Sequence, residues 1–177
     1  MDEKILKVLA YHEAGHAVVV WSLKVPLYEV KIGANGGSCN HALTVSPSLD
    51  PEMMGISDWT KVKNRARILL GGEMAERVGA QMAQLEGDDE MAELFCDAQV
   101  ISSESVVPGS DRAELKEMVQ RVFGNLGQKP NDWIGRAEVD AENIVIDNWK
   151  RICSLGKALI AKRVLSGAEA IQKIQEG

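Results

Sequence analysis

The first segment of the chain carries apolar side chains at the spacing of an α-helix. The apolar positions that share one helical face are Ile5, Leu6, Leu9, Ala17 and Val20. Pro26 follows this pattern and cannot continue a helix. The pattern therefore predicts a helix over residues 3–24.

A strand pattern comes next. Val30 and Ile32 alternate with Glu29 and Lys31, which is typical of a half-exposed strand over 27–32. The segment GANGGS at 33–38 contains Asn-Gly, a strong signal for a tight turn. HALTV at 41–45 is predicted to return as the second strand, so that a small sheet lies within residues 27–46.

The remaining segments show helical periodicity. The predicted helices cover 58–85 with an interruption at Gly71-Gly72, 91–101, about 110–123, and 133–164 with a break near Gly156. Loops are expected at 102–109 and 124–132, and the pair Ser166 and Glu169 is a capping box that begins a short final helix. These elements predict a mainly α fold with a small β-sheet, in the α+β class.

Length, composition and charge narrow the classes of protein. A chain of 177 residues corresponds to one domain, because domains usually span ~100–200 residues, so residues 1–177 are expected to form a single domain. The net charge of −6 argues against nucleic acid and against an anionic membrane surface, both of which select clustered Lys and Arg.

The apolar runs and the cysteines bear on the cellular compartment. The longest early apolar run, 17–21, is too short for a signal-peptide core or a membrane span. Cys39, Cys96 and Cys153 are widely spaced and odd in number, which favours a reducing compartment over a disulfide scaffold. A cytoplasmic location is therefore expected.

The sequence HEAGH within the first helix is a candidate metal site. His12 and His16 are four residues apart, which places both imidazoles on one helical face, ~5–6 Å from each other. Both can then reach one Zn²⁺ at Zn–N distances of ~2.0–2.1 Å. Glu13 is rotated by ~100° from His12, so it borders the ion without ligating it, and it can take a proton from a water molecule on the open coordination position.

Gly15, inside the same motif, predicts a close approach of another backbone. Glycine in the middle of a helix costs ~1 kcal/mol relative to alanine. We expect a neighbouring strand or helix to pack against this turn, since close packing is the usual reason for tolerating that cost. By contrast, His41 stands alone on a predicted strand, where a structural role is the expectation.

A catalytic zinc site needs a third protein ligand, and several carboxylates compete for that role. The HExxHxxGxxH pattern is absent because Val19 and Ser22 occupy its last two defining positions. The candidates that remain are Glu73, Glu76, Asp88, Asp89 and Asp111. As structural alternatives, the glutamates lie on a solvated helix face, Asp88 and Asp89 lie in an exposed turn, and Ser110 or Asp111 caps a helix, with Glu114 completing a D-x-x-E capping box.

The chain resembles the zinc-peptidase domain of the FtsH family of ATP-dependent proteases. The resemblance is carried by YHEAGHAVV, VPLYEVKI, GGSCNHALTV, ARILLGGEMAERV and SLGKALIAKRVLSGAEAIQKI. These segments cover roughly two thirds of the chain, although only HEAGH is highly specific. The resemblance implies a zincin-like helical peptidase domain, Zn²⁺ bound by His12, His16 and a distant aspartate, and Glu13 as the base.

The resemblance also ranks the aspartates. In the family a glycine and a few small or polar residues precede the ligand, and apolar positions follow it after four, seven and eight residues. Asp111 has this surrounding, with Leu115, Met118 and Val119 in register, and it requires an insertion over roughly 84–107. The distance of Asp88 from HEAGH is closer to that in the family. The positions four, seven and eight residues after Asp88, however, match the apolar pattern less well.

Members of the family carry an ATPase motor and membrane anchors before the peptidase domain, and these 177 residues show neither pattern. The expectation from the sequence is therefore a free-standing peptidase domain. The expected substrates are peptides, unfolded segments, or proteins supplied by a separate ATPase or adaptor. The predicted strand 41–45 is a hypothesis for an edge that pairs with a substrate strand. The family forms hexamers through its motor and peptidase parts together, so a homo-oligomer remains an open alternative.

Two classes of function follow. The first is a zinc-dependent endopeptidase in which Glu13 moves protons between the attacking water and the leaving amine. The alternative is a catalytically silent protein-interaction module with zinc as a structural clip. Structural sites usually have four protein ligands, and Glu13 has no chemical duty in such a site. Glu13 therefore favours the enzyme.

Overall fold

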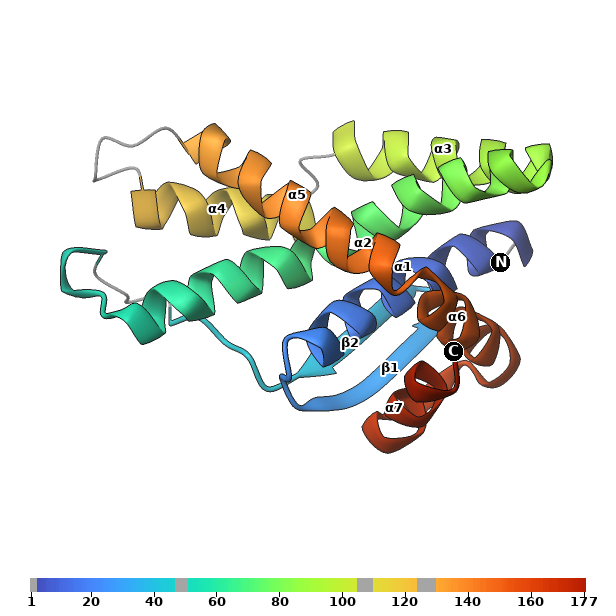
Figure 1. Cartoon of the computed structure of the whole chain (residues 1–177), viewed down its shortest axis with the longest axis horizontal. Helices are drawn as coiled ribbons and strands as arrows, with labels where there is room; N and C mark the ends of the chain where they lie inside the picture. Colours follow the sequence, from blue (N-terminus) through green and yellow to red (C-terminus); the bar gives the residue numbers. More distant parts are fainter. Residues whose placement is uncertain (1–2, 47–50, 105–109, 124–129) are drawn as a thin grey trace.

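The computed structural model describes residues 3–46, 51–104, 110–123 and 130–177 (Figure 1). The elements are α1 (Glu3–Ser22), β1 (Leu27–Gly33), β2 (Gly36–His41), the 3-10 helix η1 (Pro51–Met53), α2 (Ile56–Glu86), α3 (Asp89–Glu104), α4 (Asp111–Phe123), α5 (Pro130–Asp147), α6 (Trp149–Lys162), β3 (Val164–Ser166) and α7 (Gly167–Glu176). The fold is mainly α with a small sheet, which confirms the predicted fold class. The predicted loops at 102–109 and 124–132 lie partly outside the described residues.

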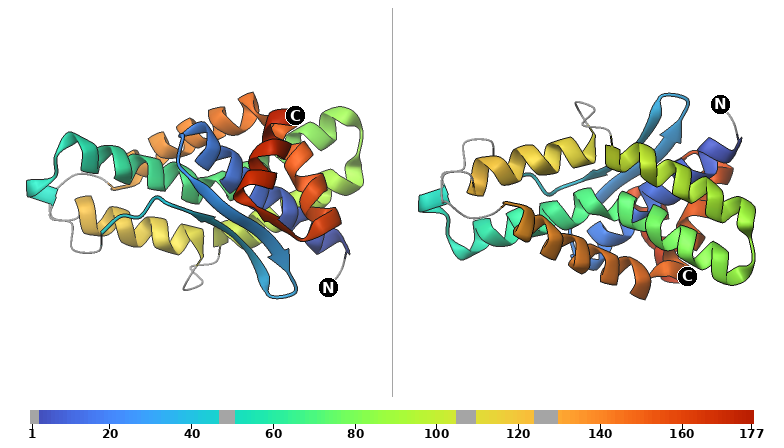
Figure 2. Two further views of the ribbon diagram at one scale, coloured as in Figure 1. Left: turned by 90° about the horizontal axis from the view of Figure 1, so that it is seen from below. Right: turned by 90° about the horizontal axis from the view of Figure 1, so that it is seen from above.

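Helix α1 is the centre of the fold. Ala14, Ala17 and the valines at 18–20 are fully buried, so this part of α1 is enclosed on several sides. It packs against α2, α6 and the sheet, and the views in Figures 1 and 2 show it between the β1–β2 hairpin and α2. The helix that carries HEAGH is therefore packed against its neighbours on several sides.

The sheet is antiparallel, in the order β2-β1-β3, and corrects the prediction of a second strand at 41–45. The tight turn pairs Gly33 with Gly36, so β2 starts immediately after the turn and pairs its last residue, His41, with Leu27. Since β1 begins at Leu27, residues beyond 41 have no strand partner in this hairpin. The third strand, β3, lies far away in sequence and was not predicted.

Helix α2 is continuous through Gly71-Gly72, where an interruption was predicted. It ends at Gly87, which has a left-handed φ of 75°, and the side chain of Asp88 accepts a hydrogen bond from the Met91 N–H at 3.1 Å. The chain reverses there, and α3 runs back along the second half of α2 (Figures 1 and 2). This hairpin occupies most of the segment 84–107, which was expected to be an insertion.

The long helix predicted over 133–164 is two helices, and the break is at Asn148 rather than near Gly156. The Asn148 side chain donates to the Ile144 carbonyl at 2.8 Å, while the Asn148 carbonyl accepts from Arg151 N–H at 2.9 Å and begins α6. Gly156 lies instead inside α6 against the Tyr11 ring.

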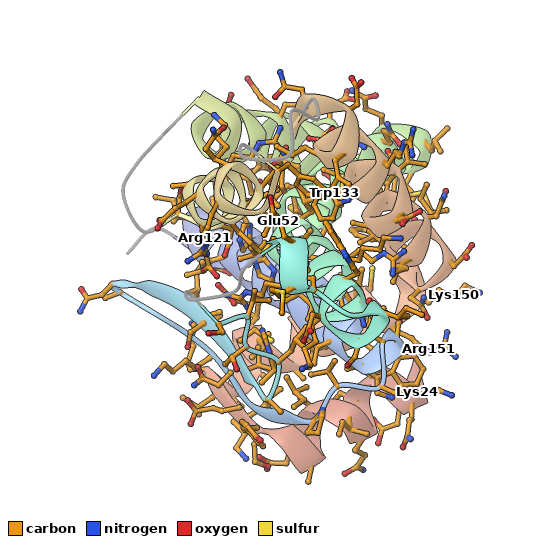
Figure 3. The ribbon with its side chains drawn as sticks, turned by 90° about the vertical axis from the view of Figure 1, so that its left-hand side faces the viewer. Lys24, Glu52, Arg121, Trp133, Lys150 and Arg151 are labelled. Carbon is orange, nitrogen blue, oxygen red and sulfur yellow. The ribbon has the colours of Figure 1, made fainter. Side chains whose placement is uncertain are left out.

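The start of α6 is held at the end of α1. The guanidinium of Arg151 lies 5.4 Å from the centroid of the Trp21 ring. In the view of Figure 3, Arg151 and Lys24, which follows α1, both lie toward the same edge of the molecule. None of the helices in the described part of the chain combines the length and the apolar character needed to cross a membrane.

Candidate metal centre

His12 and His16 lie one turn apart on α1 and point toward the same spot. Their ring centroids are 4.7 Å apart, and the two Nε2 atoms are 3.0 Å apart. The side chain of His16 is 7% exposed and that of His12 is 17% exposed. The motif therefore presents two ring nitrogens from side chains that are largely shielded from water.

Asp111 approaches the same spot from the first turn of α4. Its Oδ2 atom lies 3.0 Å from His16 Nε2 and 3.3 Å from His12 Nε2. Ser110 caps α4, because its Oγ accepts the Ala113 N–H at 3.2 Å. The D-x-x-E capping box predicted for Asp111 and Glu114 does not form, which leaves the Asp111 carboxylate free to face the histidines.

The other ring nitrogens are held by acceptors. His12 Nδ1 donates to Glu76 Oε1 at 2.8 Å, and His16 Nδ1 donates to the Ile68 carbonyl oxygen at 2.6 Å. These partners assign the proton of each neutral imidazole to Nδ1. When both imidazoles are neutral, their Nε2 lone pairs face each other and the Asp111 carboxylate, so three acceptor atoms converge on one point that a proton or a cation can occupy.

This arrangement fits a divalent cation. Among the described residues, the ligand atoms of His12, His16 and Asp111 form the one group of three or more His, Cys, Asp or Glu side chains within 4.8 Å of one another. Ligands at ~2.0–2.1 Å from a tetrahedral ion are about 3.3–3.4 Å apart. The observed separations of 3.0–3.3 Å are close to that value.

The pKa shifts of the three side chains also favour a bound cation. Burial by itself lowers the pKa of both histidines, but hydrogen bonding and attraction to Asp111 raise the pKa of each above its ordinary value. Burial would also raise the pKa of Asp111, whereas the two imidazoles hold it well below the usual range. The three side chains therefore strongly favour a positive charge at their centre.

Glu13 lies beside this cluster and is 6% exposed. A Cβ on Gly37 of β2 would lie 2.5 Å from Cγ and Oε1 of Glu13, so only glycine allows β2 to cover this side chain so closely. Burial raises the pKa of Glu13, and the neighbouring His16 and His12 oppose that rise. Glu13 is thus a buried carboxyl group, and its proton affinity depends on the charges of His12 and His16 next to it.

A cleft of about 420 Å³ opens over these side chains. The cleft is lined from β2 by Gly37, Ser38, Cys39 and His41. Arg65 of α2 also lines the cleft. Its guanidinium connects the two sides of the cleft, since it donates to Glu114 on α4 at 2.6 Å and lies 2.9 Å from His41 Nε2 of β2.

His41 lies at the edge of the cleft, 2.9 Å from the Arg65 guanidinium, and its structural role stays a prediction. Burial, together with the charges of Arg65 and His16, lowers the pKa of His41 to about 4. The ring is therefore neutral above that pH.

The competing carboxylates lie elsewhere. Glu76 is 3% exposed and orients His12 through Nδ1, and Glu73 lies 3.6 Å from the guanidinium of Arg112. Asp88 and Asp89 are exposed at the α2–α3 turn, where Asp88 caps α3. Of the five candidates, the structure brings only Asp111 to the Nε2 atoms.

Sequence reasoning missed the side of the site that α2 builds. Gly15 meets α2 as expected: a Cβ on Gly15 would collide with the Gly71 carbonyl oxygen. A Cβ on Gly72 would collide with the His12 ring, so Gly72 makes room for that imidazole. The Gly-Gly pair was the available signal, since two adjacent glycines within a helical pattern indicate close packing as readily as an interruption.

Comparison with known proteins points to one group of proteases. The chain is similar to a region of the ATP-dependent zinc metalloproteases named FtsH. It is 29% identical over 197 aligned residues to FtsH 1 of Thermoanaerobacter sp. (strain X514), covering all of this chain and 31% of that protein. FtsH of Nitrosococcus oceani is 24% identical over 193 residues, covering 98% of this chain and 29% of the relative.

A shorter stretch is similar to a third relative. FtsH of Rhodococcus erythropolis is 36% identical over 80 residues, 44% of this chain and 9% of that protein. The chain therefore spans about a third or less of the length of these curated relatives. No protein-family profile matches it.

Proposed function

We propose that this chain is a zinc-dependent endopeptidase, with His12, His16 and Asp111 as metal ligands and Glu13 as the general base. The observation that carries the proposal is the convergence of two Nε2 atoms and the Asp111 carboxylate at 3.0–3.3 Å, with a second carboxylate, that of the buried Glu13, beside them. The similarity to zinc metalloproteases named FtsH supports the choice of metal and reaction.

The proposed chemistry divides between the metal and Glu13. When bound, zinc would polarise the scissile carbonyl and lower the pKa of a water molecule to about 7. Glu13 takes a proton from the attacking water at a carboxylate oxygen and then delivers it to the leaving amine nitrogen. The close cover of Gly37 over Glu13 limits the water around that carboxylate, which keeps the transferred proton local.

The ligand set favours an enzyme over a structural zinc clip. A closed structural site has four protein ligands, whereas the group formed by the described residues has three. Glu76 and the Ile68 carbonyl fix the two imidazole rings, so the ligands are preorganised for one geometry.

The proposed substrate is an extended peptide or an unfolded segment. Strand β2 is at the edge of the sheet and lines the cleft with Gly37, Ser38, Cys39 and His41. We propose that the substrate backbone pairs with β2, which replaces the predicted edge at 41–45. The proposed setting is the cytoplasm, with peptides, or chains delivered by an ATPase or adaptor, as the substrates.

The test is Glu13→Gln. The variant should bind one zinc ion per chain as the wild type does and lose at least about 100-fold in kcat for a fluorogenic peptide, because proton transfer is removed. Glu142→Gln, which alters a partly buried glutamate paired with Arg77 outside the cleft, is the control and should keep its activity. Peptide turnover by Glu13→Gln at the wild-type rate would refute the assigned base.

The same inactive variant tests the substrate edge. With an uncleaved peptide bound, hydrogen exchange should slow at the backbone amides of 37–41. Slowing confined to other segments would exclude pairing with β2.

A further inference from the structure

The turn of α4 that carries Asp111 is not anchored by buried apolar side chains. Residues 111–113 are half-buried and Glu114 is exposed, and the buried positions of α4 begin only at Leu115. The ligand atoms of a metal site nevertheless have to keep their places within a few tenths of an ångström. Polar contacts of this first turn therefore have to hold the Asp111 carboxylate at the histidines.

Two ion pairs flank Asp111 and join its turn to neighbouring helices. Arg112 pairs with Glu138 of α5 at 2.6 Å. Glu114 Oε1 accepts two hydrogen bonds from Arg65 of α2, from Nε at 2.9 Å and from Nη2 at 2.6 Å. A guanidinium that donates two N–H groups to one carboxylate fixes a direction as well as a charge, which a lysine ammonium does not.

Arg65 also contacts the sheet. Its Nη1 atom lies 2.9 Å from Nε2 of His41, the last residue of the edge strand β2. Arg65, His41 and Asp111 line the same cleft, and the side chain of Arg65 is only 20% exposed, which strengthens its electrostatic contacts. One guanidinium therefore contacts both the helix that carries Asp111 and the strand that lines the cleft.

We propose that Arg65 is a positioning residue for the candidate metal centre. Through Glu114 it holds the first turn of α4, and with it Asp111, at the two histidines. Through His41 it keeps the end of β2 in the wall of the cleft. This inference rests on the proposed function, since it takes Asp111 as a zinc ligand. Arg65 itself donates no ligand atom and transfers no proton.

Arg67 provides a matched control two residues further along α2. It also donates from Nε and Nη2 to a single carboxylate oxygen, Oδ2 of Asp140, at 3.1 and 2.5 Å. Its side chain is 26% exposed, close to the value for Arg65. Asp140 belongs to α5, which supplies no ligand atom to the cluster formed by the described residues. The two arginines make equivalent ion pairs, and only that of Arg65 leads to Asp111.

The test compares the zinc affinity of Arg65→Gln and Arg67→Gln in the full chain, by competition with a chelating dye. Arg65→Gln should raise the zinc Kd by at least about fivefold, which is less than the ~10–100-fold typical of a partner that bonds directly to a ligand. Arg67→Gln should stay within about twofold of the wild type. In the presence of a chelator, both variants should lower the urea midpoint by similar amounts, because each loses an equivalent ion pair.

Two further measurements separate positioning from a general loss of stability. Co²⁺ bound in place of zinc has d–d absorption bands that report the coordination geometry, and these should change in Arg65→Gln but not in Arg67→Gln. Arg65→Lys, which keeps the charge but loses the paired N–H groups, should recover only part of the zinc affinity.

A double variant tests the path through Glu114. Glu114→Gln should weaken zinc binding, and adding it to Arg65→Gln should cause little further loss, because both substitutions remove the same contact. Losses that add in full would overturn the path through Glu114.

The contact with β2 has a measurement of its own. At saturating zinc, Glu13→Gln should bind a fluorescent peptide about threefold or more weakly when Arg65→Gln or His41→Ala is added, as expected for the loss of one hydrogen bond. Adding Arg67→Gln should leave the peptide affinity unchanged. His41→Ala should keep the zinc Kd of the wild type, since Glu114 still holds α4. Equal peptide affinity in all of these variants would overturn the role of Arg65 at β2.

Failure of this inference is distinguishable from failure of the proposed function. Equal changes of the zinc Kd in Arg65→Gln and Arg67→Gln would overturn the positioning role, whether or not the wild type cleaves peptides. If the wild type cleaves no peptide but the two variants differ in zinc affinity, the peptidase proposal fails and the role of Arg65 stands. A wild type that binds no zinc would overturn both.

Discussion

At the scale of single residues, Glu76 is the side chain outside the ligand set on which the candidate metal centre most depends. It is 3% exposed and accepts the Nδ1 proton of His12 at 2.8 Å. Removing such a partner typically lowers metal affinity by ~10–100-fold, since the ring loses its fixed orientation. We expect that loss for zinc in Glu76→Gln, measured by competition with a chelating dye.

Glu73 provides the matched control for Glu76. It lies one turn earlier on α2 and interacts with Arg112 rather than with a histidine of the cluster. Glu73→Gln should keep the zinc affinity of the wild type within about twofold. Equal losses in the two variants would show that charge in the cleft matters, rather than the hydrogen bond to His12.

The residues that the sequence predicted are those whose geometry is local. His12, Glu13 and His16 share one helical turn and a half, so their relation follows from helix geometry alone. Asp111 was preferred from its resemblance to a family pattern, and the structure brings it to both histidines. The positions of Glu76 and Ile68 depend on how α2 is rotated against α1, which no local pattern records.

At the scale of elements, the crossing of α1 and α2 at Gly15 and Gly71 sets the position of the metal centre. A Cβ on Gly15 would collide with the Gly71 carbonyl oxygen and lie 2.6 Å from the Ala75 Cβ. Forcing such a contact typically costs about 1–3 kcal/mol, more than alanine gains in helix propensity. Gly15→Ala should therefore lower the free energy of unfolding, measured by urea denaturation.

Gly135 in α5 is the control for that substitution. A Cβ there would meet nothing within 4 Å. Gly135→Ala should raise the free energy of unfolding by up to about 1 kcal/mol, because alanine has the higher helix propensity. A stabilising Gly15→Ala would mean that the two helices have room to separate.

The elements that the sequence failed to predict are those without a periodic apolar pattern. Strand β2 reads GGSCNH and owes its conformation to pairing with β1 after a tight turn. Strand β3 has three residues and pairs with β1 across most of the chain length. The break at Asn148 has no proline or glycine to mark it, whereas Gly156 does not interrupt its helix.

At the scale of the whole molecule, a metal ion at the centre would join segments that are distant in sequence. His16 and Asp111 are 95 residues apart, on the central helix α1 and on α4. An ion that binds only the folded state stabilises it by about 2.7 kcal/mol at a concentration 100-fold above Kd. Zinc should therefore raise the free energy of unfolding of the wild type, and a chelator should reverse the increase.

Two aspartate variants make this prediction specific. Asp111→Asn should remove most of the stabilisation by zinc, because the carboxylate that faces both histidines is lost. Asp88→Asn, at the α2–α3 turn, should respond to zinc as the wild type does. The opposite pattern would assign the third ligand to the turn and exclude the geometry described for α4.

One short stretch of α2, residues 68–76, supplies the Ile68 carbonyl to one imidazole, the Glu76 carboxylate to the other, and the glycines against which α1 lies. Sliding α2 by a single residue along its axis would misalign both rings simultaneously. The two imidazole rings should consequently become aligned for metal binding together and lose that alignment together. No state is expected in which only one ring is aligned.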